Sequence, residues 1–516
     1  MAGNSSLTAA DTDMMLDWND HQGGSIAPVP RCGSGLFALA TVLALAGCTV
    51  GPNFTPPKTA TTSYDTAPQP SLAVPGDREA EQHLALGKKV SAGWWQLFRV
   101  PQLDGVLNQA IAGNLNLAEA KANLAQAQEA VNVAAGGLYP QVTADAGATR
   151  QKVNFAALTG ISGFPNEVFN IFSFGAGIDY TLDIWGGTRR SIEREAALAQ
   201  YRSWELDGAY LTLTGNAVEQ AIHIASDDAQ LQAINDIIAE DQRNLDLVRQ
   251  ELRVGTGNDT DVQQAQSQLA TDRAQISPLE QQAVVARHAL AILVGKSPGD
   301  WAPPDFKLAD FTLPSEVPVS LPSEVVHQRP DVLAAEAQLH AASAEIGVQT
   351  AQMFPSISIS ASMNQLALFP HKLFSDQSNT WSFGPSITAP IFRGGELVAQ
   401  RRAAIDAYQA SFASYKQTVI TSFGQVADLL QALGHDAQLL GNQRQAMEAA
   451  KTSLDHLRAA YAAGNVGILP ILDAERLYEQ ALLGYLRANA QRLSDTVQIY
   501  VAMGGGGWWE PPARKL

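Results

Sequence analysis

The residue best suited to covalent chemistry is Cys48, which ends the tetrapeptide Leu45-Ala46-Gly47-Cys48. Small residues directly before a cysteine are typical of a lipobox, where the cysteine becomes diacylated and then forms the first residue of the mature chain. The apolar run 35–47 before it is too short to span a membrane as a helix and has the length of a signal-peptide core. We therefore expect a diacylglycerol group and an N-acyl chain such as palmitate at Cys48, which together give stable membrane anchoring.

Thr49 follows the cysteine, and the lack of Asp there is typical of sorting to the outer membrane of Gram-negative bacteria. The alternative is a chance cysteine after a signal core. Residues 1–30 are acidic, unlike the start of a signal peptide, so the translation start within 1–47 stays open.

Other motifs that could carry chemistry are incomplete. Gly295-Lys296-Ser297 resembles the end of a phosphate-binding loop, but Leu290 stands where that loop needs a glycine. The nine histidines form no metalloprotease pattern, and the net charge of −17 argues against nucleic acid. We expect no catalytic site, no metal site and no cofactor apart from the acyl groups on Cys48.

Two long proline-free runs dominate the chain, at 188–254 and 396–463, and a Gly-Gly pair precedes each. Both are dense in Ala, Gln, Leu and Glu, which favour helix. At about 1.5 Å per residue, each run predicts a helix on the order of 100 Å long, which no compact soluble domain needs. The pattern therefore predicts a coiled coil or a helical tube.

Shorter helices are predicted at 102–138 and 258–294. Placed end to end, they have roughly the length of the long helix 188–254, which suits a wall of helices of uniform height. Their surfaces are rich in Ala, Gln and Ser, so they need burial between neighbouring helices to be stable.

Four segments alternate apolar and polar residues: 142–149, 171–183, 356–363 and 381–391. Period-2 alternation with aromatic residues near strand ends is what a lipid-facing barrel requires, and a soluble sandwich face is the alternative. About eight strands are the minimum for a membrane barrel, so several chains would have to share one.

The chain also contains an internal duplication. Three pairs of matching residues are separated by the same number of positions: Gly255 and Gly464, Val262 and Ile471, and Gly295 and Gly504. A constant spacing from strand to turn to end predicts two tandem repeats, at 101–295 and 329–504. Each is expected to run helix, strand, strand, long helix, helix.

In combination, these features resemble the TolC/OprM-like outer-membrane factors, of the lipoprotein or NodT-like branch. The segments that carry the resemblance are 48–54, 94–98, 101–104, 182–186, 389–395, 461–464 and 472–476, together with the terminal Gly-Gly-Trp508. The resemblance covers about 48–510.

The resemblance implies a mainly α fold with a transmembrane β-barrel: a homotrimer with four strands per chain in a 12-stranded barrel, and a long periplasmic α-helical barrel. With it, the chain divides into a signal region (1–47), an anchor, tether and equatorial segment (48–100), the first repeat (101–295), an equatorial linker (296–328), the second repeat (329–504) and a tail (505–516).

The implied function is the exit channel of a tripartite, RND-type efflux system in the outer membrane. The implied partners are a periplasmic adaptor (membrane fusion) protein, an inner-membrane RND transporter and outer-membrane lipid. The expected cargo is small molecules such as drugs or toxic compounds. The alternatives are a type I protein secretion duct, or a periplasmic coiled-coil lipoprotein that acts as a scaffold or adhesin without conducting.

The resemblance also places a periplasmic gate at the turns that end the long helices. Asp261 and Asp473 fall where the family has aperture carboxylates, and Tyr461 falls where it has a gate tyrosine. Val466 and Pro470 depart from the family pattern, which puts a salt-bridge latch in doubt.

For Asp261 the alternative role is an N-cap on the returning helix. Asp473 lies too far into its helix to cap it, and three copies would form an anionic ring. The turn glycines Gly255, Gly257, Gly464 and Gly467 mark the expected adaptor contact. Loops 154–169 and 365–380 are expected to face outside.

Overall fold

The structure is a computed structural model that describes residues 49–58, 63–64, 71–74, 82–153 and 167–505. Cys48, the predicted signal region and nearly all of the predicted tail lie outside the described residues. Everything below concerns the unit Thr49–Leu516.

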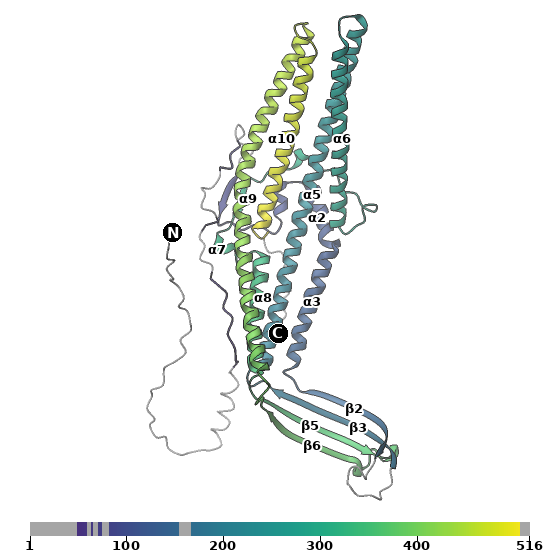
Figure 1. Cartoon of the computed structure of the whole chain (residues 1–516), viewed down its shortest axis with the longest axis vertical. Helices are drawn as coiled ribbons and strands as arrows, with labels where there is room; N and C mark the ends of the chain where they lie inside the picture. Colours follow the sequence, from purple (N-terminus) through teal and green to yellow (C-terminus); the bar gives the residue numbers. More distant parts are fainter. Residues whose placement is uncertain (1–48, 59–62, 65–70, 75–81, 154–166, 506–516) are drawn as a thin grey trace, which may run out of the picture. The chain divides into compact units, whose positions relative to one another are not determined.

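Two helical hairpins make up most of the described chain (Figure 1). Helix α5 (Gly187–Val254) turns back into α6 (Asp259–Leu293), and α9 (Glu396–Ala462) turns back into α10 (Leu469–Ala502). Helix α5 packs against α6, α8 and α10, while α9 packs against α8 and α10. The predicted ends of both long helices are confirmed to within one residue.

The predicted single helix 102–138 is wrong, because two helices replace it. Helix α2 (Pro101–Gly113) ends at Asn114, whose backbone is extended, and α3 (Leu115–Gly136) begins after it. The Asn114 side chain accepts a hydrogen bond from the Leu117 amide at 2.9 Å and so caps α3. The second half of the chain has one helix here, α8 (Pro330–Ala351).

The four predicted strands form one antiparallel sheet in the order β2-β3-β5-β6. The strands are β2 (Gln141–Val153), β3 (Glu167–Leu182), β5 (Ser356–Ala367) and β6 (Asn379–Thr388).

Their ends differ from the prediction in several places. Strand β6 stops before Pro390, which has no amide hydrogen for the ladder. Strand β3 begins inside the predicted loop 154–169, whose residues 154–166 lie outside the described part of the chain. Strands β5 and β6 both reach into the predicted loop 365–380, where two short 3₁₀ turns, η4 (Pro370–Lys372) and η5 (Asp376–Ser378), lie between them.

The pairing register separates apolar from polar side chains across all four strands. Ile178 pairs with both Val142 and Ala361, while Ser362 on the other face pairs with Ser382. The larger apolar residues that share one face include Val142, Phe172, Phe174, Ile178, Tyr180, Leu182, Ile357, Ile359, Met363, Trp381, Phe383 and Ile387. Most of them are exposed in the single chain.

A core of apolar and polar side chains joins the first residues of the folded part to its last helix. Trp94, in the turn η2 (Trp94–Phe98), stacks on Tyr500 of α10 with ring centroids 5.5 Å apart. Beside it, β1 (His83–Leu86) pairs in parallel with β4 (Glu316–Val319). The buried guanidinium of Arg492 donates to the Gln82 side chain, whose position is 410 residues away in the sequence.

The remaining elements are short: η3 (Leu308–Asp310) and α7 (Pro322–Val325) lie in the predicted linker. Among the helices of the described residues, none combines the length and the apolar character needed to cross a membrane.

Candidate functional site

The turn from α5 to α6 is fixed by glycines. Gly255 has a φ of +81°, a left-handed conformation that side chains disfavour. The amides of Thr256 and Gly257 both donate to the Glu251 carbonyl, at 3.0 and 3.1 Å. A Cβ on Gly257 would lie 3.0 Å from the Glu251 Cβ, so a side chain there would force a shift.

Helix α6 is capped by Asn258, so the interpretation of Asp261 as N-cap is wrong. The Asn258 side-chain oxygen accepts from the Asp261 amide at 3.0 Å, and its side-chain nitrogen donates to the Asp261 carboxylate at 2.9 Å. The extended backbone at Asn258 gives it the capping position. Asp261 stands in the first turn, where the helix dipole favours its negative charge.

The turn from α9 to α10 is built differently. Gly464 is also left-handed, with a φ of +77°, and the Asn465 amide donates to the Ala460 carbonyl at 2.9 Å. Gly467 is not left-handed, and a Cβ there would meet nothing within 4 Å. Helix α10 starts with Pro470 in its first turn and has no side-chain cap.

An apolar core, here called the tip core, joins the two hairpins close to these turns. Its buried members come from all four long helices and from the start of α10: Leu245, Val248, Val262, Ala265, Leu269, Leu454, Ile468, Ile471, Leu472 and Ala474. Tyr461 packs against it from α9.

Tyr461 links the hairpins directly, because its hydroxyl donates to the carboxylate of Glu251 on α5. Burial, together with the hydrogen bond and charge of Glu251, raises the pKa of Tyr461 to about 12. The hydroxyl therefore keeps its proton and its hydrogen bond at any physiological pH. The contact between the hairpins at this point joins a neutral donor to a carboxylate, and neither Val466 nor Pro470 takes part in it.

The other two predicted gate residues lie beside the tip core and point to other partners. Asp261 precedes the core residue Val262 and is held by Asn258. Asp473 lies within α10, its side chain is 74% exposed, and its ion pair with Arg476 is 3.2 Å long. The structure thus brings the three residues to the same end of the hairpins, each with its own partner.

Sequence reasoning missed a set of buried polar contacts across the hairpins. Glu475 accepts hydrogen bonds from Arg458 at 2.8 Å and from Asn244 at 2.6 Å, and Glu479 accepts from Gln275 at 2.7 Å. Their spacing on α10 was a usable signal, because Leu472, Glu475, Glu479 and Leu483 share one helical face and are all buried.

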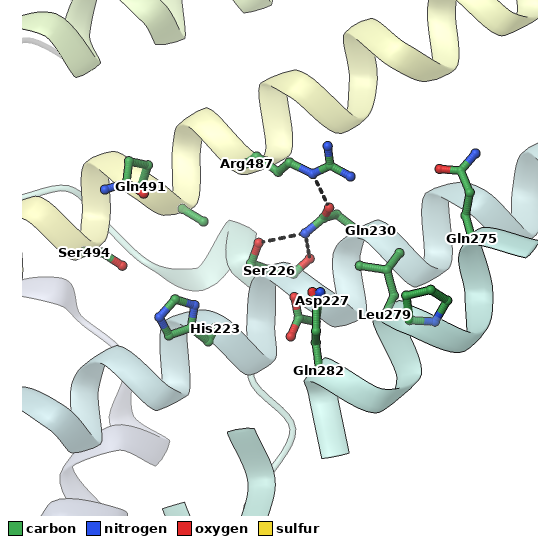
Figure 2. Close-up of a pocket in the computed structure, with 12 residues that line it drawn as sticks. His223, Ser226, Asp227, Gln230, Gln275, Leu279, Gln282, Arg487, Gln491 and Ser494 are labelled. Atoms are coloured by element: carbon green, nitrogen blue, oxygen red, sulfur yellow. Dashed lines mark hydrogen bonds between the residues drawn. The ribbon is translucent and has the colours of Figure 1, made fainter. Parts of the chain in front are cut away.

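A polar groove lies farther along the same helices, between α5, α6 and α10 (Figure 2). Its volume is about 510 Å³, and Arg487 donates to Gln230 at 2.8 Å, which in turn donates to Ser226 at 3.2 Å. Pro278 lines the groove and removes one hydrogen bond from α6. In the part of the chain that the structure describes, no cluster of His, Cys, Asp or Glu is arranged to hold a metal ion.

The residues just after Cys48 are clamped against the start of α5. Arg190, almost fully buried, donates to the Val50 carbonyl at 3.1 Å and to the Asn53 side chain at 2.8 Å. Gly51 fits because a Cβ there would lie 2.5 Å from the backbone of Gly347 on α8. A segment that follows the predicted lipid site is therefore fixed where strand β3 passes into α5.

Comparison with known proteins agrees with this geometry. The family model described as "Outer membrane efflux protein" matches residues 106–296 and 321–505. The chain is 30% identical to the pyoverdine export outer membrane protein OpmQ of Pseudomonas aeruginosa, over 84% of this chain and 92% of that protein. It is also 30% identical to the toluene efflux pump outer membrane protein TtgC of Pseudomonas putida, over 92% and 96%.

Solved structures give the same result. The outer-membrane channel OprN matches with a TM-score of 0.77 and 28% identity, over 89% of this chain and 99% of that one. The CmeC outer membrane channel of Campylobacter jejuni, 20% identical, shares the fold with a TM-score of 0.80 over 89% and 95%. With matches of this extent, the chain belongs to the outer membrane efflux protein family, whose members are outer-membrane channels and not enzymes.

Proposed function

We propose that three copies of this chain form the outer-membrane exit channel of a tripartite, RND-type efflux system. A periplasmic adaptor protein and an inner-membrane RND transporter would deliver small molecules to it. The relatives named above export pyoverdine and toluene, which supports a small-molecule cargo over a secreted protein.

The observation that carries this proposal is the exposed apolar face of the sheet. Trp381 and Phe383 are 76% and 69% exposed, on strand β6 at one edge of the sheet. An apolar face of this kind is stable against lipid, but unpaired backbone groups at a sheet edge in lipid cost several kcal/mol each. The edges therefore have to pair, β6 of one copy with β2 of the next.

Three copies of the four-stranded sheet would close a barrel of twelve strands, above the minimum of about eight. A non-conducting scaffold has no need for such a face. The acylated Cys48 would add a second membrane attachment, next to the residues that Arg190 clamps.

Gating would occur at the tip core. Tyr461 joins α9 to α5 through Glu251, and Asp261 supports the turn beside it. Opening would separate the α5–α6 hairpin from the α9–α10 hairpin, and it would break the Tyr461 hydrogen bond. Asp473, exposed on α10, would face the same opening in each copy and favour cations there.

The test is single-channel recording in planar bilayers with the purified full-length protein, after its migration as a trimer has been checked without heating. We expect conductance, and we expect Tyr461→Phe and Asp261→Ala to raise the open probability. Tyr485→Phe, in the middle of α10, is the matched control and should behave as the original chain does. A monomer without conductance would exclude the channel, and unchanged gating in both tip variants would exclude this gate.

A further inference from the structure

Next to the tip core, four carboxylic acids lie buried between the hairpins. Asp241 is on α5, Asp272 on α6, and Glu475 and Glu479 are on α10. Asp241 and Asp272 are only 2% and 1% exposed. Several ionised carboxylates at such burial would repel one another and would each lose hydration, so their hydrogen-bond partners decide which of them stay charged.

Three of the four carboxyl groups accept hydrogen bonds from other side chains. Glu475 receives the Arg458 guanidinium and the Asn244 amide, so it is stabilised as a carboxylate. Asp272 accepts from Gln268 at 2.8 and 3.1 Å, and Glu479 accepts from Gln275.

Asp241 is the exception. Among the described residues, no donor reaches either of its two buried oxygens. After burial, the carboxyl group of Asp272, itself an acceptor, contributes most to the raised pKa of Asp241. Two carboxyl groups can share a hydrogen bond only if one of them carries a proton, and Asp272, with amide donors of its own, is the better anion.

We propose that Asp241 and Asp272 form a proton-binding site in the helical wall. Asp241 carries the proton, and its O–H group donates a hydrogen bond to the Asp272 carboxylate. The bound proton stabilises the packing of α5 against α6 and α10 and so holds the tip closed. This role in closure rests on the proposed channel function, while the proton site itself does not.

The surrounding charges support this assignment. The groups that act on Asp241 are Asp272 from α6 and Glu475 and Glu479 from α10, and the nearby cation Arg458 of α9 is engaged by Glu475. Burial, then the hydrogen bond and charge of Asp272, raise the pKa of Asp241 to about 9. Burial and the charge of Asp272 raise the pKa of Glu479 to about 7.

The direction of the pH effect follows from these shifts. An exposed Asp in an open tip has a pKa of about 3.9, so the closed tip binds the proton more strongly. Closure is therefore favoured at low pH and weakens as the pH rises through the pKa values of the closed state. Between about pH 7 and 9 Asp241 contributes most of the effect, because Glu479 is already half deprotonated at pH 7. Each chain then loses up to about tenfold in its closed-to-open ratio per pH unit.

The experiment compares the open probability of the full-length protein in planar bilayers at pH 7 and pH 9. The original chain should open more at pH 9, up to about 100-fold per chain over the two pH units. Asp241→Asn keeps a donor toward Asp272 at every pH and should leave only the roughly twofold rise that Glu479 supplies above pH 7. A rise equal to that of the original chain in Asp241→Asn would overturn the proposal.

The control is a second buried carboxyl pair, which lies farther from the tip. Asp436 of α9 has its pKa raised to about 8 by burial and by Asp495 of α10. Opening at the tip moves Glu475 and Glu479 of α10 away from Asp241. Asp436 lies farther from the tip along α9, so Asp436→Asn should keep the rise between pH 7 and pH 9. Loss of the rise in this variant would show that the α9–α10 pair is the sensor and would overturn the assignment to Asp241.

Infrared spectroscopy tests the site without reference to conduction. The carbonyl band of a protonated carboxylic acid should be present at pH 7 and lost as the pH rises through about 9. Asp241→Asn should remove that component at pH 7. An unchanged band in this variant contradicts the proton site, whereas absence of conductance at every pH contradicts only the channel.

Discussion

Helices α5 and α9 have nearly the same length, 68 and 67 residues, yet they occupy different environments. Helix α5 is surrounded by α3, α6, α8 and α10, and its middle is largely buried. Helix α9 contacts α8 and α10 and leaves Ile420 64% exposed. Helix α5 therefore joins the other helices of the chain, while α9 leaves apolar side chains exposed in the single chain.

The strongest test of this difference replaces one isoleucine on each helix. Ile222 of α5 is fully buried, so Ile222→Ala should lower the free energy of unfolding by about 2–5 kcal/mol. Ile420→Ala should change it by less than about 0.5 kcal/mol in a dissociated chain and should instead weaken the proposed trimer. Denaturant unfolding in detergent measures the first effect, and trimer dissociation on native gels measures the second. Equal losses of unfolding free energy would contradict the comparison.

The glycines of the two hairpin turns give a smaller effect. Gly255→Ala and Gly464→Ala should each cost roughly 1–2 kcal/mol, because both residues are left-handed. Gly467→Ala is the control, since its backbone is not left-handed and its surroundings are open. Amide hydrogen exchange in the flanking helix turns measures the difference. A loss at Gly467 as large as at Gly255 would show that the turn geometry described here is wrong.

The smallest expected effect concerns the caps. Asn258→Ala should destabilise the start of α6 by about 1 kcal/mol, and Asn258→Ser should restore most of the loss. Asn465→Ala, in the turn without a side-chain cap, should have almost no effect. Exchange rates of the first amides of α6 and α10 are the measurement, and identical changes at both turns would refute the difference.

Much of the fold follows from local sequence. Unbroken helix-forming runs after Gly186-Gly187 and before Gly255 predicted α5 to within one residue, and strict alternation predicted the four strands. The break at Asn114 was missed although Gly113, directly before it, disfavours helix. Besides its local cap on the Leu117 amide, the Asn114 side chain donates to the Leu293 carbonyl at 2.9 Å, a tertiary contact that no local pattern indicates.

The candidate site was less predictable. The turns and Tyr461 were placed correctly at the tip, but the partner Glu251 comes from the other hairpin and no local pattern indicates it. Asp241 and Asp272 each interrupt an apolar stripe with coiled-coil spacing, such as Val262, Ala265, Leu269, Asp272 and Ile276. In a helix rich in charged residues, that spacing becomes informative only when the inward face is known.

The contact between Arg492 and Gln82 has a consequence for the order of folding. The two residues are 410 positions apart, and β1 likewise pairs with β4 from a distant part of the sequence. Contacts across such separations form late, because the intervening chain must first be brought together. When the polypeptide crosses the inner membrane amino end first, the residues around Gln82 cannot pack until α10 has emerged. The part of the folded region that reaches the periplasm first is therefore the last to fold.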